Sequence, residues 1–274
     1  MRHPTPKFRV VTTRSCPVRE TAAVTETDLG RGTFDDPAAP LRAFGSARAV
    51  LFDFDGPVCD LFAGYTTVDV ADRIKRTARQ YWGPLDPAVE KCDNSHGVLR
   101  PLRDMYERSV PRPSALPLER AEAAVTALEW QAVRTALPTP HLHALVDLLL
   151  DHGKRLALVS NNAEGPIREY LAGLGLAPKF DGVFGRSPHD ARLMKPHPDC
   201  VHRALRHLAL PASDCLLIGD QLTDLEAARS AGTGFLGLTH HPGRALRMEQ
   251  GGADAVLGSY LPVLRAADAL SLRD

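Results

Sequence analysis

The sequence of 274 residues lacks any long uninterrupted apolar segment. No stretch approaches the run of about 18 apolar residues that a membrane-spanning helix needs. The N-terminus also lacks the apolar region of roughly 7 to 15 residues that secretory signals contain. We therefore expect a cytoplasmic protein that has no membrane partner.

Cysteines are few and are not grouped. They are odd in number and never spaced as C-x-x-C: Cys16, Cys59, Cys92, Cys200 and Cys215. This pattern favours neither a disulfide framework nor a zinc ribbon. We expect reduced cysteines that are mostly buried as small residues.

An excess of charge of one sign is absent as well. The chain has 33 Lys plus Arg against 33 Asp plus Glu, so its formal net charge is zero. This balance removes the global electrostatic reason to expect nucleic acid or an anionic membrane as a partner. Hydrophobic residues make up 44% of the chain, enough for a substantial core. We expect a globular monomer or homodimer whose functional charges are local.

Composition and periodicity divide the chain into three regions. Residues 1–45 are rich in proline and show no sustained period of two or 3.6 residues, so we predict an N-terminal arm that is partly disordered. Residues 46–59 and 139–274 have the features of an α/β domain. Residues 60–138 interrupt this domain and form a separate region.

Short apolar runs that end in polar residues or glycine recur along the α/β part. They are residues 47–56, 156–162, 215–220 and 234–238, with 255–257 as a possible edge strand. Such runs are typical of buried strands in a parallel sheet.

Helical patterns lie between these runs. Residues 142–149 repeat apolar side chains at i, i+3, i+4 and i+7, and Gly153 follows as a stop. A second helix is expected after Pro166, and Thr223 with Glu226 has the spacing of a capping box that opens a third. Alternating strands and helices predict a doubly wound, Rossmann-like α/β sheet with right-handed crossovers.

The region inserted after the first strand is predicted to be all helical. About 100 residues separate the first two strands, whereas a crossover with its helix needs only about a dozen. We see no strand signal between residues 61 and 138, and Pro117 is well placed to start a helix. A helical cap domain with hinges near Asp60 and residues 138–140 follows from this pattern.

Acidic residues follow two of the expected strands. Asp53 and Asp55 end the first, and Asp220 and Asp224 follow a later one. The carboxyl ends of parallel strands meet at one crevice, where such sheets bind ligands. Two carboxylates about 4 Å apart repel by roughly 4 kcal/mol at an effective dielectric near 20, so they need a cation, a proton or a positive partner. An all-oxygen cluster suits Mg²⁺, which we predict as the cofactor.

A hydroxyl and a lysine accompany these acids. Ser160 and Asn161 end the second expected strand, and Lys195 lies in a segment that Pro196 and Pro198 stiffen. A hydroxyl donor and an ammonium group suit an anion. Together with acids for a metal ion, they predict a phosphate site.

Four ordered motifs resemble those of the haloacid dehalogenase-like hydrolase superfamily. They are Asp53-Phe54-Asp55-Gly56, Ser160-Asn161, Lys195-Pro196 and Gly219-Asp220-Gln221-Leu222-Thr223-Asp224. The resemblance spans about residues 48–260. The insert resembles the helical cap of the subfamily I branch, which includes phosphoglycolate phosphatases and β-phosphoglucomutases.

The resemblance implies roles for the matched acids. Asp53 is expected to be the nucleophile that forms an aspartyl-phosphate. Asp55 is expected to protonate the leaving oxygen and then to act as base toward water, a role that points away from dehalogenation because a halide needs no proton. Asp53, Asp220 and the backbone carbonyl of Asp55 are expected to hold the metal ion, with Asp224 in support.

The same resemblance implies a set of phosphate contacts. Ser160 and the backbone amide of Asn161 are expected to donate to phosphoryl oxygens, while Lys195 offsets negative charge. We also assign Gly56 to the phosphate site. Two alternatives stay open from the residues themselves: Ser160 could cap the following helix, and Asp224 could simply favour a helix N-terminus.

The cap offers candidates for substrate recognition. We assign His96 and Arg100, in and just after an expected loop, as candidate substrate contacts, because such enzymes often place specificity residues there. A basic set on an expected cap helix has two readings, a contact with an anionic substrate or an ordinary solvated face: Arg73, Lys75, Arg76 and Arg79.

The leading functional hypothesis is an Mg²⁺-dependent phosphatase. Its partner is expected to be a small phosphorylated metabolite, such as a sugar, polyol or nucleotide phosphate monoester. The alternatives are a sugar phosphomutase of the same superfamily and a catalytically silent binding module. No nucleic-acid partner is expected.

Overall fold

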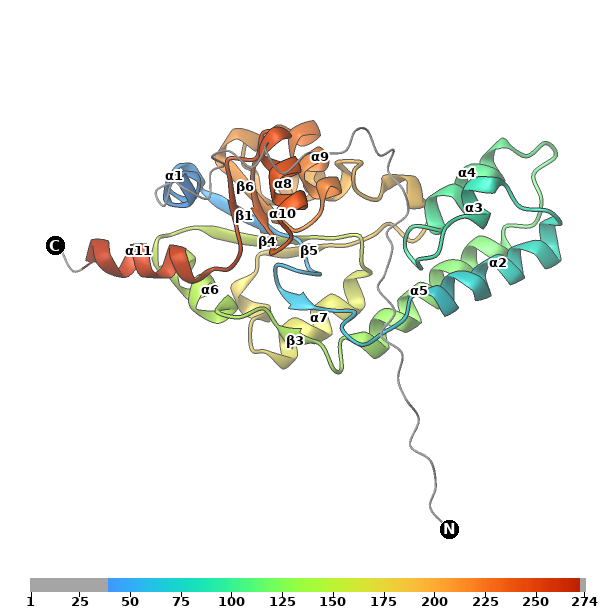
Figure 1. Ribbon diagram of the computed structural model, residues 1–274, viewed down its shortest axis with the longest axis horizontal. Coiled ribbons are helices and arrows are strands. Elements are labelled where there is room, and N and C mark those ends of the chain that lie inside the picture. The colour runs from blue at the N-terminus through green and yellow to red at the C-terminus, as the bar shows by residue number, and fades with distance from the viewer. Residues whose placement is uncertain (1–38, 272–274) are drawn as a thin grey trace, which may run out of the picture.

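The computed structural model describes residues 39–271 of the chain (Figure 1). Residues 1–38 of the predicted arm lie outside this part. The end of that arm is not irregular as predicted, because residues 39–46 form helix α1 (Ala39–Ser46), whose Ala39 and Phe44 are buried against the main core. No helix in the described part is long and apolar enough to cross a membrane.

A six-stranded parallel sheet forms the centre of the molecule, as predicted. In spatial order its strands are β5 (Gly182–Phe184), β4 (Arg155–Val159), β1 (Ala49–Phe52), β6 (Cys215–Gly219), β7 (Gly234–Leu238) and β8 (Ala255–Leu257). The possible edge strand at 255–257 is confirmed as β8. The opposite edge strand, β5, was not predicted, because its two apolar residues, Val183 and Phe184, lie between Gly182 and Gly185.

Helices cover both faces of this sheet (Figure 1). One face carries α1, α6 (Leu142–Asp151), α7 (Glu164–Gly173) and α11 (Leu261–Ser271). The other carries α8 (Asp199–Leu208), α9 (Leu222–Ala231) and α10 (Pro242–Gln250). Alternate residues of β1 explain both layers, because Val50 and Phe52 join the first core and Ala49 and Leu51 the second.

Helix α9 begins at Leu222 and is capped by Gln221. The predicted capping box of Thr223 and Glu226 is therefore wrong. Gln221 is the N-cap residue, and Asp224 is the third helical residue. The amide of Gln221 donates to Oδ2 of Asp224 at 2.9 Å. The carboxylate that serves the helix is therefore one of the predicted site residues.

Four helices form the cap, which we define as the chain between strands β2 and β3. They are α2 (Val68–Trp82), α3 (Pro87–Glu90), α4 (Leu99–Arg108) and α5 (Leu116–Ala132). They enclose a hydrophobic core of their own and gather at one end of the molecule (Figure 1). The helix predicted at Pro117 is α5, with the proline in its first turn.

The two chain segments that connect the core to the cap are joined by two short antiparallel strands. Strand β2 (Cys59–Asp60) pairs with β3 (Leu137–Pro138). The prediction of no strand between residues 61 and 138 is therefore wrong at its last residues, because two-residue strands leave no pattern in a sequence. The pair lies at the predicted hinge positions. Three short 3-10 helices complete the described elements: η3 (Ala177–Lys179), η4 (Ala191–Leu193) and η5 (Ala212–Asp214).

Candidate active site

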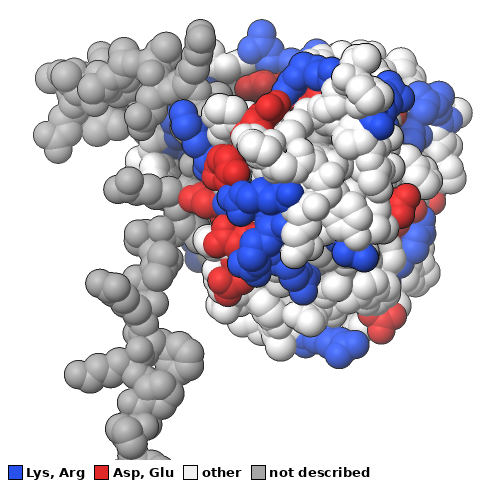
Figure 2. Space-filling model, turned by 90° about the vertical axis from the view of Figure 1, so that its right-hand side faces the viewer, with Lys and Arg blue, Asp and Glu red and all other residues white. Residues whose placement is uncertain are grey.

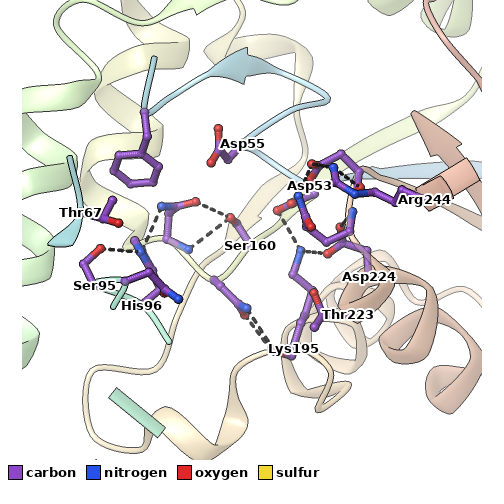
Figure 3. Close-up of a pocket in the computed structure, with 16 residues that line it drawn as sticks. Asp53, Asp55, Thr67, Ser95, His96, Ser160, Lys195, Thr223, Asp224 and Arg244 are labelled. Carbon is purple, nitrogen blue, oxygen red and sulfur yellow. Dashed lines mark hydrogen bonds and ion pairs between the residues drawn. The ribbon is translucent and has the colours of Figure 1, made fainter. Parts of the chain in front are cut away.

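A pocket of about 440 Å³ lies between the carboxyl end of the sheet and the cap (Figure 3). Its core side includes Asp53, Asp55, Ser160, Asn161, Lys195, Asp220 and Asp224. Its cap side includes Phe62, Thr67, Asn94, Ser95 and His96. The structure thus brings most of the predicted site residues to one cavity.

Lys195 is buried between two carboxylates at the floor of this pocket. Its Nζ lies 2.8 Å from Oδ1 of Asp53 and 2.6 Å from Oδ1 of Asp224 (Figure 3). Burial opposes the charge of the ammonium group, but Asp224 and Asp53 outweigh it and raise the pKa of Lys195. Burial also raises the pKa of Asp53, to about 6, although Lys195 pulls it down. A solvated lysine at position 195 is excluded by this geometry.

Asp55 stands beside Asp53 after the end of β1 and has a different environment. Burial raises its pKa to about 7, while the amide of Leu61, which donates to Oδ1 at 2.9 Å, opposes the rise. A carboxyl group with this pKa holds a proton for part of the time at neutral pH. It can therefore serve as an acid and as a base.

Asp220 completes the acidic side of the pocket. Burial and the charges of the other site carboxylates raise its pKa to about 8. Arg244, on α10, opposes this rise, and its guanidinium lies 3.3 Å from Oδ2 of Asp220. The site therefore carries more negative charge than its own cations balance.

Three carboxylates could hold a metal ion. Asp53, Asp220 and Asp224 each offer an oxygen, and these oxygens lie within 4.8 Å of one another. The two oxygens of Asp224 also bind Lys195 and the amide of Gln221. Asp224 therefore fits a supporting role, while Asp53 and Asp220 are the better candidates for direct ligands.

Two glycines make the close approach of these acids possible. Gly56 has φ +101°, and a Cβ there would lie 2.7 Å from Cγ of Asp220. A Cβ on Gly219 would lie 2.4 Å from Cβ of Asp224. Gly56, predicted as a phosphate contact, is not among the residues that line the pocket; its position makes room for Asp220.

The loop after β4 holds the predicted phosphate donors. The hydroxyl of Ser160 donates to Oδ1 of Asn162 at 3.0 Å and accepts from the amide of Asn162 at 3.2 Å. Asn161 accepts from the backbone amide of Lys195 at 2.7 Å and donates to its carbonyl at 3.2 Å. The side chain of Asn161 thus aligns the lysine segment, while α7 begins after Ala163 with no side-chain cap from Ser160.

Of the two cap residues predicted to contact the substrate, only His96 lines the pocket. Its Nδ1 lies 3.2 Å from the hydroxyl of Ser95 and its Nε2 lies 2.7 Å from Oε1 of Glu129. Arg100 is exposed and does not line the pocket.

The predicted basic set on α2 is not one continuous face. Lys75 is buried and donates to the carbonyl of Cys92 at 3.0 Å, and Arg79 pairs with Glu90. Figure 2 shows basic and acidic side chains interleaved at this end of the molecule. This arrangement favours the reading of a solvated surface.

Several polar residues that line the pocket or lie next to it were missed by sequence reasoning. They are Glu129 on α5, Asn162 and Arg186 in core loops, and Arg244 on α10. One signal was present for Glu129, because it lies on the same helical face as Val125 and Ala132, which are apolar and buried.

Known proteins resemble this chain in sequence and fold. The sequence model of the haloacid dehalogenase-like hydrolase family matches residues 47–232. A phosphoglycolate phosphatase of Colwellia psychrerythraea is 35% identical over 203 residues, covering 70% of this chain and 84% of that protein. One of Rhodospirillum rubrum is 31% identical over 198 residues, covering 68% and 76%.

Other comparisons are more partial. Three further phosphoglycolate phosphatases match over only about half of their length, 49%, 57% and 57%. A solved haloacid dehalogenase-like hydrolase from Streptococcus pneumoniae has a TM-score of 0.55 at 19% identity, covering 81% of this chain and 99% of that one. This likeness shows a shared fold.

Proposed function

The chain is an enzyme of the haloacid dehalogenase-like hydrolase family, and we propose that it is an Mg²⁺-dependent phosphatase that cleaves a phosphate monoester of a small metabolite. The observation that carries this proposal is the pair of carboxyl groups after β1. Asp53 is held by Lys195, and Asp55 has a pKa raised to about 7. An ionised nucleophile beside a group that holds a proton is what cleavage of such an ester needs.

In the first step, Asp53 attacks the phosphorus atom and the bond to the leaving oxygen breaks. Lys195 occupies Oδ1 of Asp53, which leaves Oδ2 as the attacking atom. Asp55 gives its proton to the leaving oxygen, so that the alcohol departs neutral. The hydroxyl of Ser160, turned from Oδ1 of Asn162 toward the phosphoryl group, and the amide of Asn161 hold the phosphoryl oxygens. The product is an aspartyl-phosphate on Asp53.

In the second step, water replaces Asp53 on the phosphorus atom. Asp55, now ionised, takes a proton from that water as it attacks, and the bond between phosphorus and Oδ2 of Asp53 breaks. Inorganic phosphate leaves and both carboxyl groups return to their starting states. Lys195 stabilises Asp53 as a departing carboxylate.

The donor set fits Mg²⁺. It consists of carboxylate oxygens only, and burial together with the charges of Asp224 and Asp53 raises the pKa of Asp220, so that a bound cation would favour its ionised form. Asp53 and Asp220 are the residues that would hold the ion, with Asp224 behind them. When bound, the ion neutralises charge between a carboxylate and the phosphoryl group.

The cap side of the pocket supports a small hydroxylated leaving group. Thr67, Asn94 and Ser95 offer hydroxyl and amide groups there, and Phe62 offers an aromatic ring. Such groups suit a sugar, polyol or nucleoside. A carboxylated compound such as phosphoglycolate, after which the relatives are named, belongs in the same test because Arg244 also lines the pocket.

Phosphate release from a panel of these monoesters, with and without Mg²⁺, tests the proposal. We expect release that requires Mg²⁺ and that Asp53→Asn abolishes. Asp60→Asn is the matched control, because it removes an exposed carboxylate of the neighbouring strand β2 that does not line the pocket. Full activity of Asp53→Asn would overturn the role of Asp53 as nucleophile.

A further inference from the structure

A glutamate of the cap lies buried against the core loop that follows β4. Glu129, on α5, has no exposed surface. Its Oε2 accepts from the backbone amide of Ala163 at 3.1 Å, and its Oε1 accepts from Nδ2 of Asn162 at 3.2 Å. Both donors belong to the loop of residues 160–163, which carries the phosphate donors named above. A cap residue is thus bonded directly to the phosphate loop.

The same loop also bonds to Arg186, the arginine that forms an ion pair with Glu129. Arg186, in the loop after β5, has a fully buried side chain whose Nη1 lies 2.7 Å from Oε1 of Glu129. That Nη1 also donates to the carbonyl of Asn161 at 2.6 Å, and the backbone amide of Arg186 donates to the carbonyl of Asn162 at 2.8 Å. The two members of this ion pair therefore both bond to the backbone of the loop: Arg186 to the carbonyls of Asn161 and Asn162, and Glu129 to the amide of Ala163.

We propose that Glu129 is a positioning residue that holds the phosphate loop in its binding geometry from the cap. This inference rests on the proposed function, because it assumes that residues 160 and 161 bind the phosphoryl group. A backbone donor binds a phosphoryl oxygen well only when its peptide plane is fixed. Glu129 and Arg186 fix the two peptide units that flank Asn162, which follow directly on the unit that carries the amide of Asn161. The docked cap thereby limits the movement of the loop that carries the phosphate donors of the core.

Glu122 on the same helix provides a matched control. It also pairs with Arg186, whose Nη2 lies 2.8 Å from its Oε1, and it also joins the cap to the core. The hydrogen bonds of Glu122 go to Arg186 and Thr126, and none reaches residues 160–163. Glu122→Gln and Glu129→Gln remove the same charge and weaken the same arginine, but only Glu129→Gln acts on residues 162 and 163. It also alters the contact of Glu129 with His96, so the exchange of the Ala163 amide is the readout that isolates the loop.

The first experiment measures the loop itself. Amide hydrogen exchange of residues 160–163 is compared in the wild type, Glu129→Gln and Glu122→Gln. We expect faster exchange at Ala163 in Glu129→Gln and wild-type exchange in Glu122→Gln. Equal exchange in the two variants would overturn the inference. This readout needs no turnover.

The second experiment measures the dissociation constant of inorganic phosphate in the presence of Mg²⁺. We expect it to rise about tenfold in Glu129→Gln and to stay within about twofold in Glu122→Gln, with kcat/KM for an ester falling in parallel. Glu129→Asp keeps the charge but shortens the side chain, and we expect the same loss of affinity. Equal shifts in Glu129→Gln and Glu122→Gln would show a merely structural role. Thermal unfolding of each variant confirms that it is folded.

The outcomes separate this inference from the proposed function. If the wild type binds phosphate and the variants differ as expected, yet no ester is cleaved, the phosphatase proposal fails and the positioning role stands. If esters are cleaved and the two glutamine variants behave alike, the positioning role fails. Wild-type protein that does not bind phosphate with Mg²⁺ would contradict both.

Discussion

Two buried clusters of this protein each hold one cation between two carboxylates. In the core, Lys195 lies between Asp53 and Asp224; at the boundary with the cap, Arg186 lies between Glu129 and Glu122. The two clusters contain similar charges, but the pKa of Asp53 and the pKa of Glu129 shift in opposite directions. Burial raises the pKa of Asp53 to about 6.

The pKa of Glu129 moves down instead, to about 2. Burial alone would raise it, but hydrogen bonds and charges from His96 and Arg186 outweigh that effect. The amides of Asn162 and Ala163 add further donors. Asp53 has fewer donors and lies near other carboxylates. With many donors, the carboxylate of Glu129 stays ionised far below neutral pH, whereas Asp53, with fewer donors, has a raised pKa that suits the nucleophile we propose it to be.

Removal of the core cation should have the largest effect on catalysis. Lys195→Met leaves Asp53 and Asp224 without their shared ammonium group, and we expect kcat/KM to fall by roughly 10³-fold. Steady-state kinetics with an ester that the wild type cleaves measures this. Circular dichroism of the variant controls for its fold. Activity close to wild type would contradict the view that the Lys195 cluster serves catalysis while the Arg186 cluster serves mainly stability.

Removal of the boundary cation should act mainly on stability. Arg186→Met leaves the buried carboxylate of Glu129 and the partly buried one of Glu122 without the arginine that they share, which costs about 3 to 5 kcal/mol in systems of this kind. Urea unfolding at pH 7 measures the loss. Because a proton can neutralise the buried Glu129 once Arg186 is gone, we expect part of the lost stability to return as the pH is lowered. A variant as stable as the wild type at pH 7 would contradict this reading.

The lowered pKa of Glu129 predicts a pH dependence of folding. Its folded pKa of about 2 lies below the usual value of 4.5, so its contribution is complete above pH 4.5 and is lost as the pH falls from 4.5 toward 2. The shift corresponds to about 3 kcal/mol. Between pH 4.5 and pH 2, the free energy of unfolding should depend less on pH in Glu129→Gln than in the wild type. Glu90→Gln, which breaks an exposed pair with Arg79, should keep the wild-type profile.

The smallest effect is expected at Arg100. Its side chain is exposed on α4 and does not line the pocket. Arg100→Ala should therefore leave kcat/KM within about twofold of wild type, as surface substitutions usually do. The same kinetic assay measures it. A loss of tenfold or more would show that the cap uses a surface that the structure places outside the pocket.

Sequence patterns predicted the sheet and its acidic edge because both depend on local order. Apolar runs followed at once by Asp53 or Asp220 require only that each strand be buried and end where the polarity changes. The pair β2 and β3 escaped prediction because strands of two residues contain less than one reliable period. Strand β5 escaped because its two apolar residues lie between glycines.

The capping of α9 shows a finer limit. Both Gln221 with Asp224 and Thr223 with Glu226 have suitable spacing. The structure selects Gln221 because the strand before it ends at Gly219, which fixes where the helix can begin. Asp224 then serves the helix amide and Lys195 together.

The sequence by itself determined which residues are candidates for the chemistry: Asp53, Asp55, Ser160 and Asp220 follow expected strands, and Lys195 lies in a segment that prolines stiffen. Only the tertiary structure decided which charges are buried together. Glu129 and Arg186 are 57 residues apart and belong to different regions of the chain. Their pairing depends on how the cap packs on the core, and packing between distant segments leaves no local period in a sequence.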